Sequence, residues 1–195
     1  MIKNLTNIFD TELLESLDPG SISSVKYEGW FGTVYKIDIL NKSYALKVFK
    51  ETMHNGIANR DIAVYDYEVL ETLNNSSHYP TLHAYKENQW MLVDWVIGKP
   101  FRTVSNKEAY SSQLYNAYRD AVNAGWFPDD VKGDNIVYSN DSIVIIDVGS
   151  YLPAQHKVNY SIDERVEFVI RHAHIYPSVR DRPPYKFKEY NLISK

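Results

Sequence analysis

The sequence FPDDVKGDNIV occupies residues 127–137, and IVIIDVG follows at residues 143–149. The first stretch reads Asp-x-Lys-x-x-Asn from Asp130 to Asn135, and the second is an apolar run that ends in Asp147 and a glycine. Carboxylate and amide oxygens are ligands that Mg²⁺ accepts, and a lysine beside them can neutralise phosphate charge. An acidic turn between two strands would explain either loop alone. Both loops at this separation indicate phosphoryl-transfer chemistry.

A second candidate group lies earlier in the chain, where the apolar stretch 44–48 contains a single cation, Lys47. Burying an ammonium group costs free energy unless an anion accompanies it, so Lys47 either faces solvent on an edge strand or meets a carboxylate. The next predicted helix offers two carboxylates. Asp66 falls on its apolar face, whereas Glu68 lies about 200° around the helix axis. The pattern favours Asp66 as the partner, with Glu68 as the second candidate.

Glycines interrupt the strands that precede Lys47. Residues 27–35 read YEGWFGTVY, which places Gly29 and Gly32 between two predicted strands. Glycine lets the backbone approach a phosphate closely and direct its amides toward it. A strand-turn-strand setting suits a phosphate-covering hairpin better than a dinucleotide-binding turn, which opens a helix. An ordinary hairpin with glycine turns would show the same pattern.

The apolar pattern predicts a strand-rich half followed by a mostly helical half, with a cleft between them. The break at Gly98-Lys99-Pro100 divides a single α+β domain into parts of about residues 1–96 and 97–195. Strands are predicted within 22–49 and at 82–85, 90–96, 136–138 and 143–146, and helices at 8–18, 59–74, 106–124 and 161–174. The second hairpin within 22–49 is predicted to turn at Asn41-Lys42. The apolar face of the first helix is predicted to carry Ile8, Leu13, Leu14 and Leu17.

Composition excludes several function classes. The chain has 195 residues, a net charge of −4 and no cysteine. An acidic chain lacks the basic surface that nucleic acids need, and without cysteine there are no disulfides or thiolate sites. No stretch has the roughly 18 apolar residues of a membrane span, and the N-terminus lacks a classical signal peptide. We expect no nucleic-acid partner, no membrane span, and a protein that is cytoplasmic or secreted into a host cell by another route.

Residues 22–150 resemble the protein-kinase superfamily through these motifs. The resemblance implies a two-lobed fold, with a strand-rich N-lobe and a truncated, mostly helical C-lobe, and ATP and Mg²⁺ as cofactors. The positions that it implies for chemistry are Asp130 as the catalytic base, Lys132 on the γ-phosphate, Lys47 on the α- and β-phosphates with Asp66 as its ion-pair partner, and Asn135 and Asp147 as Mg²⁺ ligands.

The same resemblance implies a nucleotide-binding surface. The sequence LVDWVIG at residues 92–98 is similar to a kinase hinge, which makes Val93 the gatekeeper and gives the adenine contacts to backbone groups of Asp94 and Val96. The residues implied to surround the nucleotide are Gly29, Gly32, Val34, Ala45, Lys47, Val93, Asp94, Val96, Val137 and Ile146.

The departures from the family pattern are informative. Tyr27 stands at the first glycine, and Pro128-Asp129 replaces the His-Arg before the catalytic aspartate. Val148 replaces a phenylalanine and is expected to supply an apolar plug in its place. Only 46 residues follow Gly149, too few for the usual helical lobe. Such truncation resembles the miniature kinases of bacteria and their viruses, including type III secreted effector kinases of the OspG and HopBF kind. It implies an enzyme that loop phosphorylation does not switch on, and that is constitutively active or activated by a partner.

Three functions fit the sequence. A protein Ser/Thr kinase is favoured because Lys132 is typical of kinases that act on Ser or Thr. Its partner would be a protein substrate, which for an effector would be a host protein such as a chaperone or a ubiquitin-pathway enzyme, and we expect a monomer. A small-molecule kinase of the aminoglycoside or choline kind is disfavoured by the short chain. A pseudokinase or toxin-like binding module is motivated by Tyr27, Asp66 and Pro128-Asp129.

Overall fold

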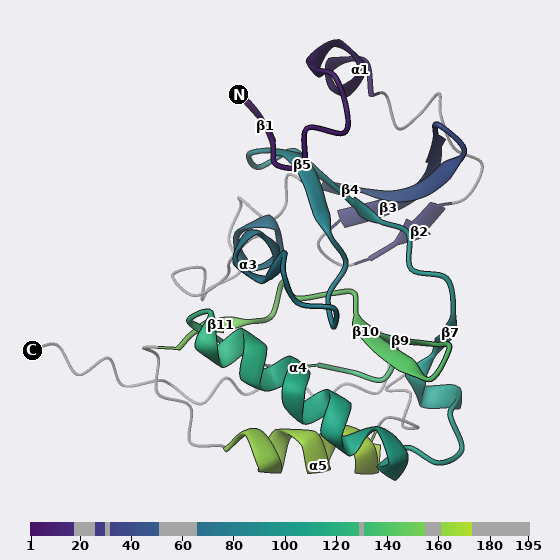
Figure 1. Ribbon diagram of the computed structural model, residues 1–195, viewed down its shortest axis with the longest axis vertical. Helices are drawn as coiled ribbons and strands as arrows, with labels where there is room; N and C mark the ends of the chain where they lie inside the picture. Colours follow the sequence, from purple (N-terminus) through teal and green to yellow (C-terminus); the bar gives the residue numbers. More distant parts are fainter. Residues whose placement is uncertain (18–25, 30–31, 51–65, 129–130, 155–160, 173–195) are drawn as a thin grey trace, which may run out of the picture.

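One antiparallel sheet dominates the molecule. The computed structural model describes residues 1–17, 26–29, 32–50, 66–128, 131–154 and 161–172. These residues form a mixture of strands and helices, which confirms the predicted α+β class. The sheet has six strands in the order β1-β5-β6-β4-β3-β2 (Figure 1). Their bounds are β1 Ile2–Asn4, β2 Lys26–Glu28, β3 Gly32–Ile39, β4 Lys42–Phe49, β5 Leu82–Lys86 and β6 Trp90–Asp94.

The helices and two small sheets complete the described fold. Figure 1 shows α3 beside the large sheet, and α4 packed against α5 at the opposite end of the molecule. One small sheet has the order β10-β9-β7 and the other pairs β11 with β8. The helices are α1 Thr11–Glu15, α3 Asp66–Leu73, α4 Ser111–Asn123 and α5 Ile162–His172, with 3₁₀ turns at Phe101–Thr103 and Glu108–Tyr110, and the remaining strands are β7 Lys99–Pro100, β8 Trp126–Phe127, β9 Ile136–Ser139, β10 Ser142–Ile145 and β11 Leu152–Pro153.

The β3–β4 hairpin turns one residue earlier than its sequence suggests. We predicted the turn at Asn41-Lys42, but Lys42 is already paired with Ile39 across the hairpin. The turn residues are Leu40 and Asn41, with φ of 50° and 63°. A two-residue turn with positive φ at both positions matches the twist of the strands that it joins. Asn41 tolerates this conformation well, which fixes the register of the whole hairpin.

The N-terminal segment covers one face of the large sheet. Phe9 and Leu14 are 4% and 1% exposed, and they pack with Ile37, Tyr44 and other residues on that face. Helix α1 is shorter than the predicted 8–18, because the Asp10 carboxylate accepts a hydrogen bond from the Leu13 amide and caps a helix that begins at Thr11.

The helical pattern therefore placed Ile8 wrongly on the buried side of α1. Ile8 precedes the capping residue, lies outside the helix and is 52% exposed. Its neighbour Phe9 enters the core instead.

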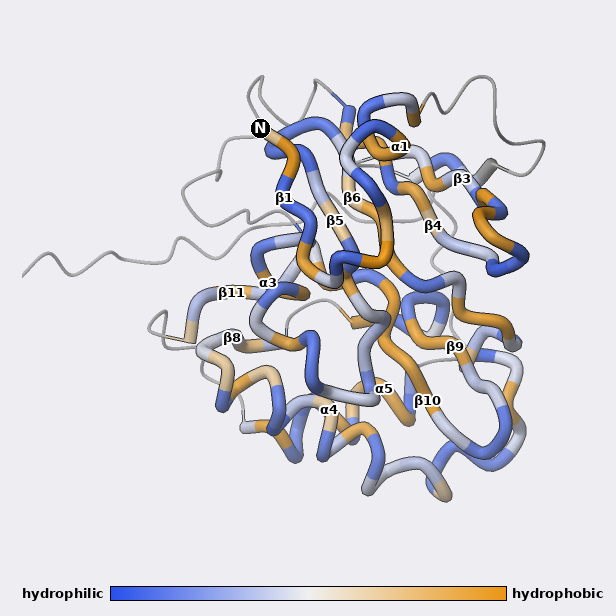
Figure 2. Tube along the Cα trace, turned by 45° about the horizontal axis from the view of Figure 1, so that its top comes forward, coloured by the Kyte–Doolittle hydropathy of each residue, from blue (hydrophilic) through white to orange (hydrophobic). Residues whose placement is uncertain are grey.

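The other face of the sheet contacts the helices. Leu70 on α3 and Leu114 on α4 belong to the same continuous core as Met91 on β6 and Ile145 on β10. Figure 2 shows hydrophobic residues along β6 and β10 through the middle of the molecule. β6 is a continuous apolar and buried run, whereas buried and more exposed residues alternate along β10. The predicted helix 59–74 is described only from Asp66 onward, and residues 59–65 lie outside the described residues.

The sequence pattern missed β1. Three residues are too few to show a periodicity, and β1 is held by pairing with β5, where Lys3 lies opposite Tyr85.

The helix predicted from residue 106 begins only at Ser111, after a 3₁₀ turn. Within the described ranges, none of the helices is both long enough and apolar enough to cross a bilayer.

The covered face of the sheet gives a test of α1 docking. Leu14→Ala should lower the free energy of unfolding by about 2–5 kcal/mol, because a buried leucine leaves a cavity. Ile8→Ala, in the same segment but exposed, should change it by less than about 0.5 kcal/mol. Urea denaturation followed by circular dichroism measures both. Equal effects would show that α1 does not pack on the sheet.

Candidate active site

Strand register gathers several predicted site residues on one face of the large sheet. Val34 on β3 lies opposite Lys47 on β4, and Lys47 lies opposite Met91 on β6. Ala45 lies opposite Val93 in the same way. Directly opposed residues in antiparallel strands point to the same face, and alternate residues on a strand do so too. These side chains therefore share the face that is turned toward α3 and the main core.

The Lys47 ammonium group meets two carboxylates on this face. Its Nζ lies 2.8 Å from Asp66 Oδ2 and 3.4 Å from Asp147 Oδ1. Lys47 is only 9% exposed and Asp66 only 2% exposed. The structure thus pairs Lys47 with Asp66, the favoured candidate. Three segments far apart in sequence, namely β4, α3 and the residues after β10, converge on one charged cluster.

Electrostatics favour the charged forms of Lys47 and Asp147. Burial opposes the charge of Lys47, but the negative charges of Asp147 and Asp66 outweigh it and raise the lysine pKa above its ordinary value. The positive charge of Lys47 lowers the pKa of Asp147. Burial raises the pKa of Asp66, and the nearby Asp147 adds to this effect while Lys47 opposes it. Asp147, with a side chain 43% exposed, is the carboxylate that remains accessible to a ligand.

Asp66 also holds the backbone of the loop after β10. The Val148 amide donates to Asp66 Oδ1 at 3.2 Å, and the Val148 side chain is fully buried. A Cβ on Gly149 would lie 3.2 Å from Asp66 Oδ2. Glycine at this position therefore allows the close approach of the Asp66 carboxylate. The apolar plug predicted at Val148 and the glycine after it both serve this contact.

The predicted catalytic loop is described only in part. Asp130, the proposed base, lies outside the described residues. Lys132 and Asn135 form a turn in which the Asn135 amide donates to the Lys132 carbonyl at 2.9 Å. The Ile146 amide donates to the Asn135 carbonyl at 2.8 Å, which brings this loop next to Asp147. Asn135 and Asp147 thus lie on neighbouring segments, as a shared cation would require.

Arg102 secures the same loop from the other side. Its amide donates to the Gly133 carbonyl at 3.2 Å, and its guanidinium forms an ion pair with Asp134. Charged hydrogen bonds of this kind hold a loop more firmly than neutral ones. Arg102 was not predicted as a site residue, because it lies about thirty residues before the loop and no motif near it indicates this contact.

A hydrogen bond closes the glycine hairpin next to its turn. The Gly29 amide donates to the Gly32 carbonyl at 2.8 Å, and Lys50 Nζ donates to the Gly29 carbonyl at 3.0 Å. A Cβ on Gly32 would lie 2.6 Å from the Val48 carbonyl oxygen, so only glycine fits there. Residues 30–31 at the tip lie outside the described residues.

The predicted adenine contacts come from two sheets. Val34, Ala45 and Val93 lie on the large sheet, whereas Val137 lies on β9 of the small sheet and Ile146 follows β10, with 39% exposure. Strand register places Val34, Ala45 and Val93 on one face within the large sheet. In the predicted hinge the Asp94 amide already donates a hydrogen bond to the Thr81 carbonyl at 3.1 Å. The Val96 amide donates no backbone hydrogen bond within the described residues.

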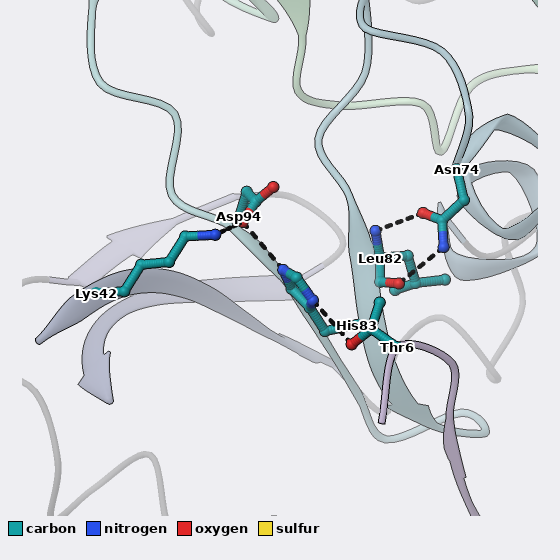
Figure 3. A network of polar contacts seen from close by, with 6 residues as sticks. All are labelled: Thr6, Lys42, Asn74, Leu82, His83 and Asp94. Atoms are coloured by element: carbon teal, nitrogen blue, oxygen red, sulfur yellow. Dashed lines mark hydrogen bonds and ion pairs between the residues drawn. The ribbon is translucent and has the colours of Figure 1, made fainter. Parts of the chain in front are cut away.

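A polar network around the buried His83 side chain anchors the predicted hinge (Figure 3). Asp94 Oδ1 contacts His83 Nε2 at 3.0 Å and accepts from Lys42 Nζ at 2.8 Å. The other ring nitrogen of His83 lies 3.1 Å from the Thr6 hydroxyl, in the N-terminal segment. Since an ionised carboxylate only accepts, the Nε2–H of His83 donates to Asp94. The end of β6 is therefore tied to both the neighbouring hairpin and the N-terminal segment.

A β-bulge explains why the sequence did not reveal this network. Leu82 pairs with Val93 and Ala84 with Leu92, so His83 is an extra residue in β5. A bulge redirects a side chain against the alternation of its strand. Figure 3 also shows Asn74, whose side chain exchanges two hydrogen bonds with the Leu82 backbone at 2.6 and 2.9 Å, beside the bulge.

The comparisons with known proteins do not place the chain in a family. No protein-family model matches it, and no curated protein matches it. Within the described ranges, which leave out Asp130, no group of three or more His, Cys, Asp or Glu side chains is arranged to hold a metal ion. The geometry around Lys47 therefore carries the functional argument.

The contact between Asp66 and Gly149 predicts that a glutamate at position 66 would not fit here. Asp66→Glu should lower the free energy of unfolding by about 1–3 kcal/mol, because the added methylene overpacks the space beside Gly149. Asp66→Ala should lower it by about 3–5 kcal/mol, since it leaves Lys47 buried with only the longer Asp147 contact.

Urea denaturation measures these effects, and the double variant Lys47→Met/Asp66→Leu is the control. It should recover the part of the lost stability that comes from the unpaired Lys47 charge, while the Val148 amide still lacks its acceptor. An Asp66→Glu protein as stable as the wild type would contradict the steric argument.

The hinge network predicts a pH-dependent contribution to stability. Although burial opposes its charge, Asp94 has a lowered pKa because His83 and Lys42 donate hydrogen bonds to it. A carboxyl group with a depressed folded-state pKa stabilises the fold above its unfolded pKa of about 3.9, and this stabilisation is lost as pH falls through the folded-state pKa.

Asp94→Asn should therefore cost about 1–3 kcal/mol at pH 7, and the difference from wild type should shrink below pH 4. Urea denaturation across this pH range measures the difference, with the exposed Glu87→Gln as the control. A difference that stays constant down to pH 3 would rule out the network as its source.

Proposed function

We propose that the protein is an ATP-dependent kinase that transfers the γ-phosphate of Mg-ATP to a Ser or Thr hydroxyl of another protein. The observation that carries this proposal is the convergence of Lys47, Asp66 and Asp147. A lysine on a strand, paired with a carboxylate on the following helix and next to a second carboxylate after an apolar strand, is the arrangement that phosphoryl transfer in kinases requires. Lys47 and Asp147 are 100 residues apart, so chance pairing of neighbours does not explain it.

The proposed arrangement is a two-lobed kinase fold. The large sheet and α3 would form the N-lobe, up to about residue 96, and the segment from α4 onward would form the C-lobe. The Gly98 backbone supports a tight crossing between them, because a Cβ there would lie 2.3 Å from the Tyr138 carbonyl oxygen. The nucleotide would bind between the Lys47 face of the sheet and the β9–β10 hairpin.

The donor set fits a magnesium nucleotide. Asp147 offers an accessible carboxylate, and Asn135 an amide oxygen on the adjoining segment; both are hard oxygen ligands of the type that Mg²⁺ prefers. When bound, the metal neutralises phosphate charge in the transition state. Lys47, kept charged by its two carboxylates, would hold the α- and β-phosphates, and Lys132 the γ-phosphate.

The remaining step is proton removal from the acceptor hydroxyl. Asp130 is proposed as the base that accepts this proton as the oxygen attacks the γ-phosphorus. The bond from that phosphorus to the bridging oxygen of ADP breaks, and ADP leaves with the electron pair. The Arg102–Asp134 ion pair would hold the loop that carries both Asp130 and Lys132.

The proposal names a protein as substrate because Lys132 is typical of Ser/Thr protein kinases. If the enzyme is a secreted effector, the substrate would be a host protein such as a chaperone or a ubiquitin-pathway enzyme. A small-molecule kinase would need an acidic helical insert, whereas the described residues after Gly149 contain only β11 and α5. Regulation would come from a partner or be absent, since Pro128-Asp129 supplies no arginine for a phosphorylated loop.

The test is phosphate transfer by the purified protein. Incubation with Mg-ATP and a cell lysate should label one or a few proteins on Ser or Thr, detected by phosphosite mass spectrometry. Asp130→Ala should reduce labelling by about 10²-fold or more, as removal of a general base does, and Lys47→Met and Asp147→Ala should also abolish it.

Asp163→Asn on α5, an exposed carboxylate change, is the control and should keep full activity. Label that appears only on an added small alcohol would favour the small-molecule kinase. Unchanged activity or toxicity in Lys47→Met and Asp130→Ala would sink the catalytic proposal and favour a binding module.

A further inference from the structure

An aromatic pair spans the predicted mouth of the nucleotide site. Tyr27 on β2 and Trp95, the residue after β6, have ring centroids 6.0 Å apart and planes tilted by 31°. In the sheet β2 and β6 are separated by β3 and β4. With neighbouring strands about 4.8 Å apart, their backbones are about 14 Å apart. The two side chains therefore reach toward each other over the two strands between them. We refer to Tyr27 and Trp95 as the aromatic arch.

The arch stands on the face that carries Lys47. Tyr27 lies directly opposite Val34, which lies opposite Lys47, so these three side chains share a face. The contact with Tyr27 shows that Trp95 projects to this same side. Ala45, on the β4 strand that the arch spans, has the smallest side chain of the face apart from glycine. Below the arch, this face therefore carries the small Ala45 side chain with Lys36 opposite it on β3.

Tyr27 is open to solvent, and Trp95 is half-buried. Tyr27 is 57% exposed, whereas Tyr44 on the other face is 3% exposed. The Lys36 ammonium group lies 5.9 Å from the Trp95 ring centroid, a cation–π contact that holds the indole in place. An exposed aromatic surface of this kind gains free energy when a flat apolar ring covers it.

The position of the arch selects its ligand. Val34 and Ala45 lie between it and the Lys47 charge cluster, so a ligand on this face would have an apolar flat end at the arch and an anionic end at Lys47. A nucleoside triphosphate has this shape and charge distribution. Because every base has a π-face, base–aromatic stacking contributes to affinity without hydrogen bonds.

We propose that Tyr27 and Trp95 pack against the adenine ring of ATP and set the affinity for the base, while Lys47 holds the phosphates. The tyrosine at the first position of the glycine hairpin thereby replaces backbone flexibility with a stacking surface. This inference rests on the proposed function, and it assigns to Tyr27 a contact that a glycine could not make.

The test separates base binding from phosphate binding. Isothermal titration calorimetry with Mg-ATP and with Mg-tripolyphosphate is performed on the full chain and on Tyr27→Ala and Trp95→Ala. Each variant should weaken Mg-ATP binding by about tenfold, the size of one lost base–aromatic contact, and leave Mg-tripolyphosphate binding unchanged. Tyr27→Phe should keep wild-type affinity. Phe168→Ala, which removes an aromatic side chain 53% exposed on α5, is the matched control.

Fluorescence supplies a second readout. Mg-ATP should change the tryptophan emission of the wild type, and Trp95→Phe should keep most of the affinity while losing most of that change. Unchanged Mg-ATP affinity in Tyr27→Ala and Trp95→Ala overturns the proposed role of the arch in adenine binding. An equal loss of affinity for Mg-ATP and Mg-tripolyphosphate also overturns it, because it would indicate a collapsed hairpin. In both cases the kinase proposal stands as long as the wild type binds and uses ATP. Absence of Mg-ATP binding by the wild type overturns both proposals.

Discussion

The buried ammonium group of Lys47 constrains the rest of the structure. An unpaired charge at this depth would cost several kcal/mol, so the strand that carries it is compatible only with a fold that delivers a carboxylate to it. Asp66 and Asp147 arrive from 19 and 100 residues away. The docking of α3 on the sheet and the return of the chain after β10 are therefore parts of one electrostatic requirement, and the apolar core forms around it.

The short side chain of Asp66 makes this arrangement compact. Its carboxylate serves Lys47 with one oxygen and the Val148 amide with the other, so neither the ammonium group nor that buried amide is left without a partner. The cost is that the loop must approach α3 closely, which glycine at position 149 allows without displacing the Asp66 carboxylate. In a chain of 195 residues, a single carboxylate that fixes both a strand cation and a loop backbone replaces contacts that a larger protein distributes over more side chains.

The sequence was sufficient for the parts of the site that local pattern determines. The apolar face of a helix selected Asp66 over Glu68, and the spacing of two loops indicated that Asp147 would belong to the same site. Long-range pairing was beyond it, because nothing in three residues reveals that β1 adds to the edge of β5. The His83 bulge was equally hidden, since one inserted residue reverses the alternation from which faces are inferred. Contacts across two strands, such as Tyr27 with Trp95, depend on sheet curvature that no local window contains.

The two faces of the large sheet have opposite chemistry, and the charged face depends on the apolar one for stability. Phe9 and Leu14 cover the apolar face, and the burial of that face stabilises the fold independently of the opposite face. That opposite face can then carry a charge cluster, whose net contribution to stability is small or unfavourable. The Thr6–His83–Asp94 network links the two, because it ties the N-terminal cover to the end of β6. The N-terminal segment thus stabilises the site residues although it touches none of the three charges at its centre.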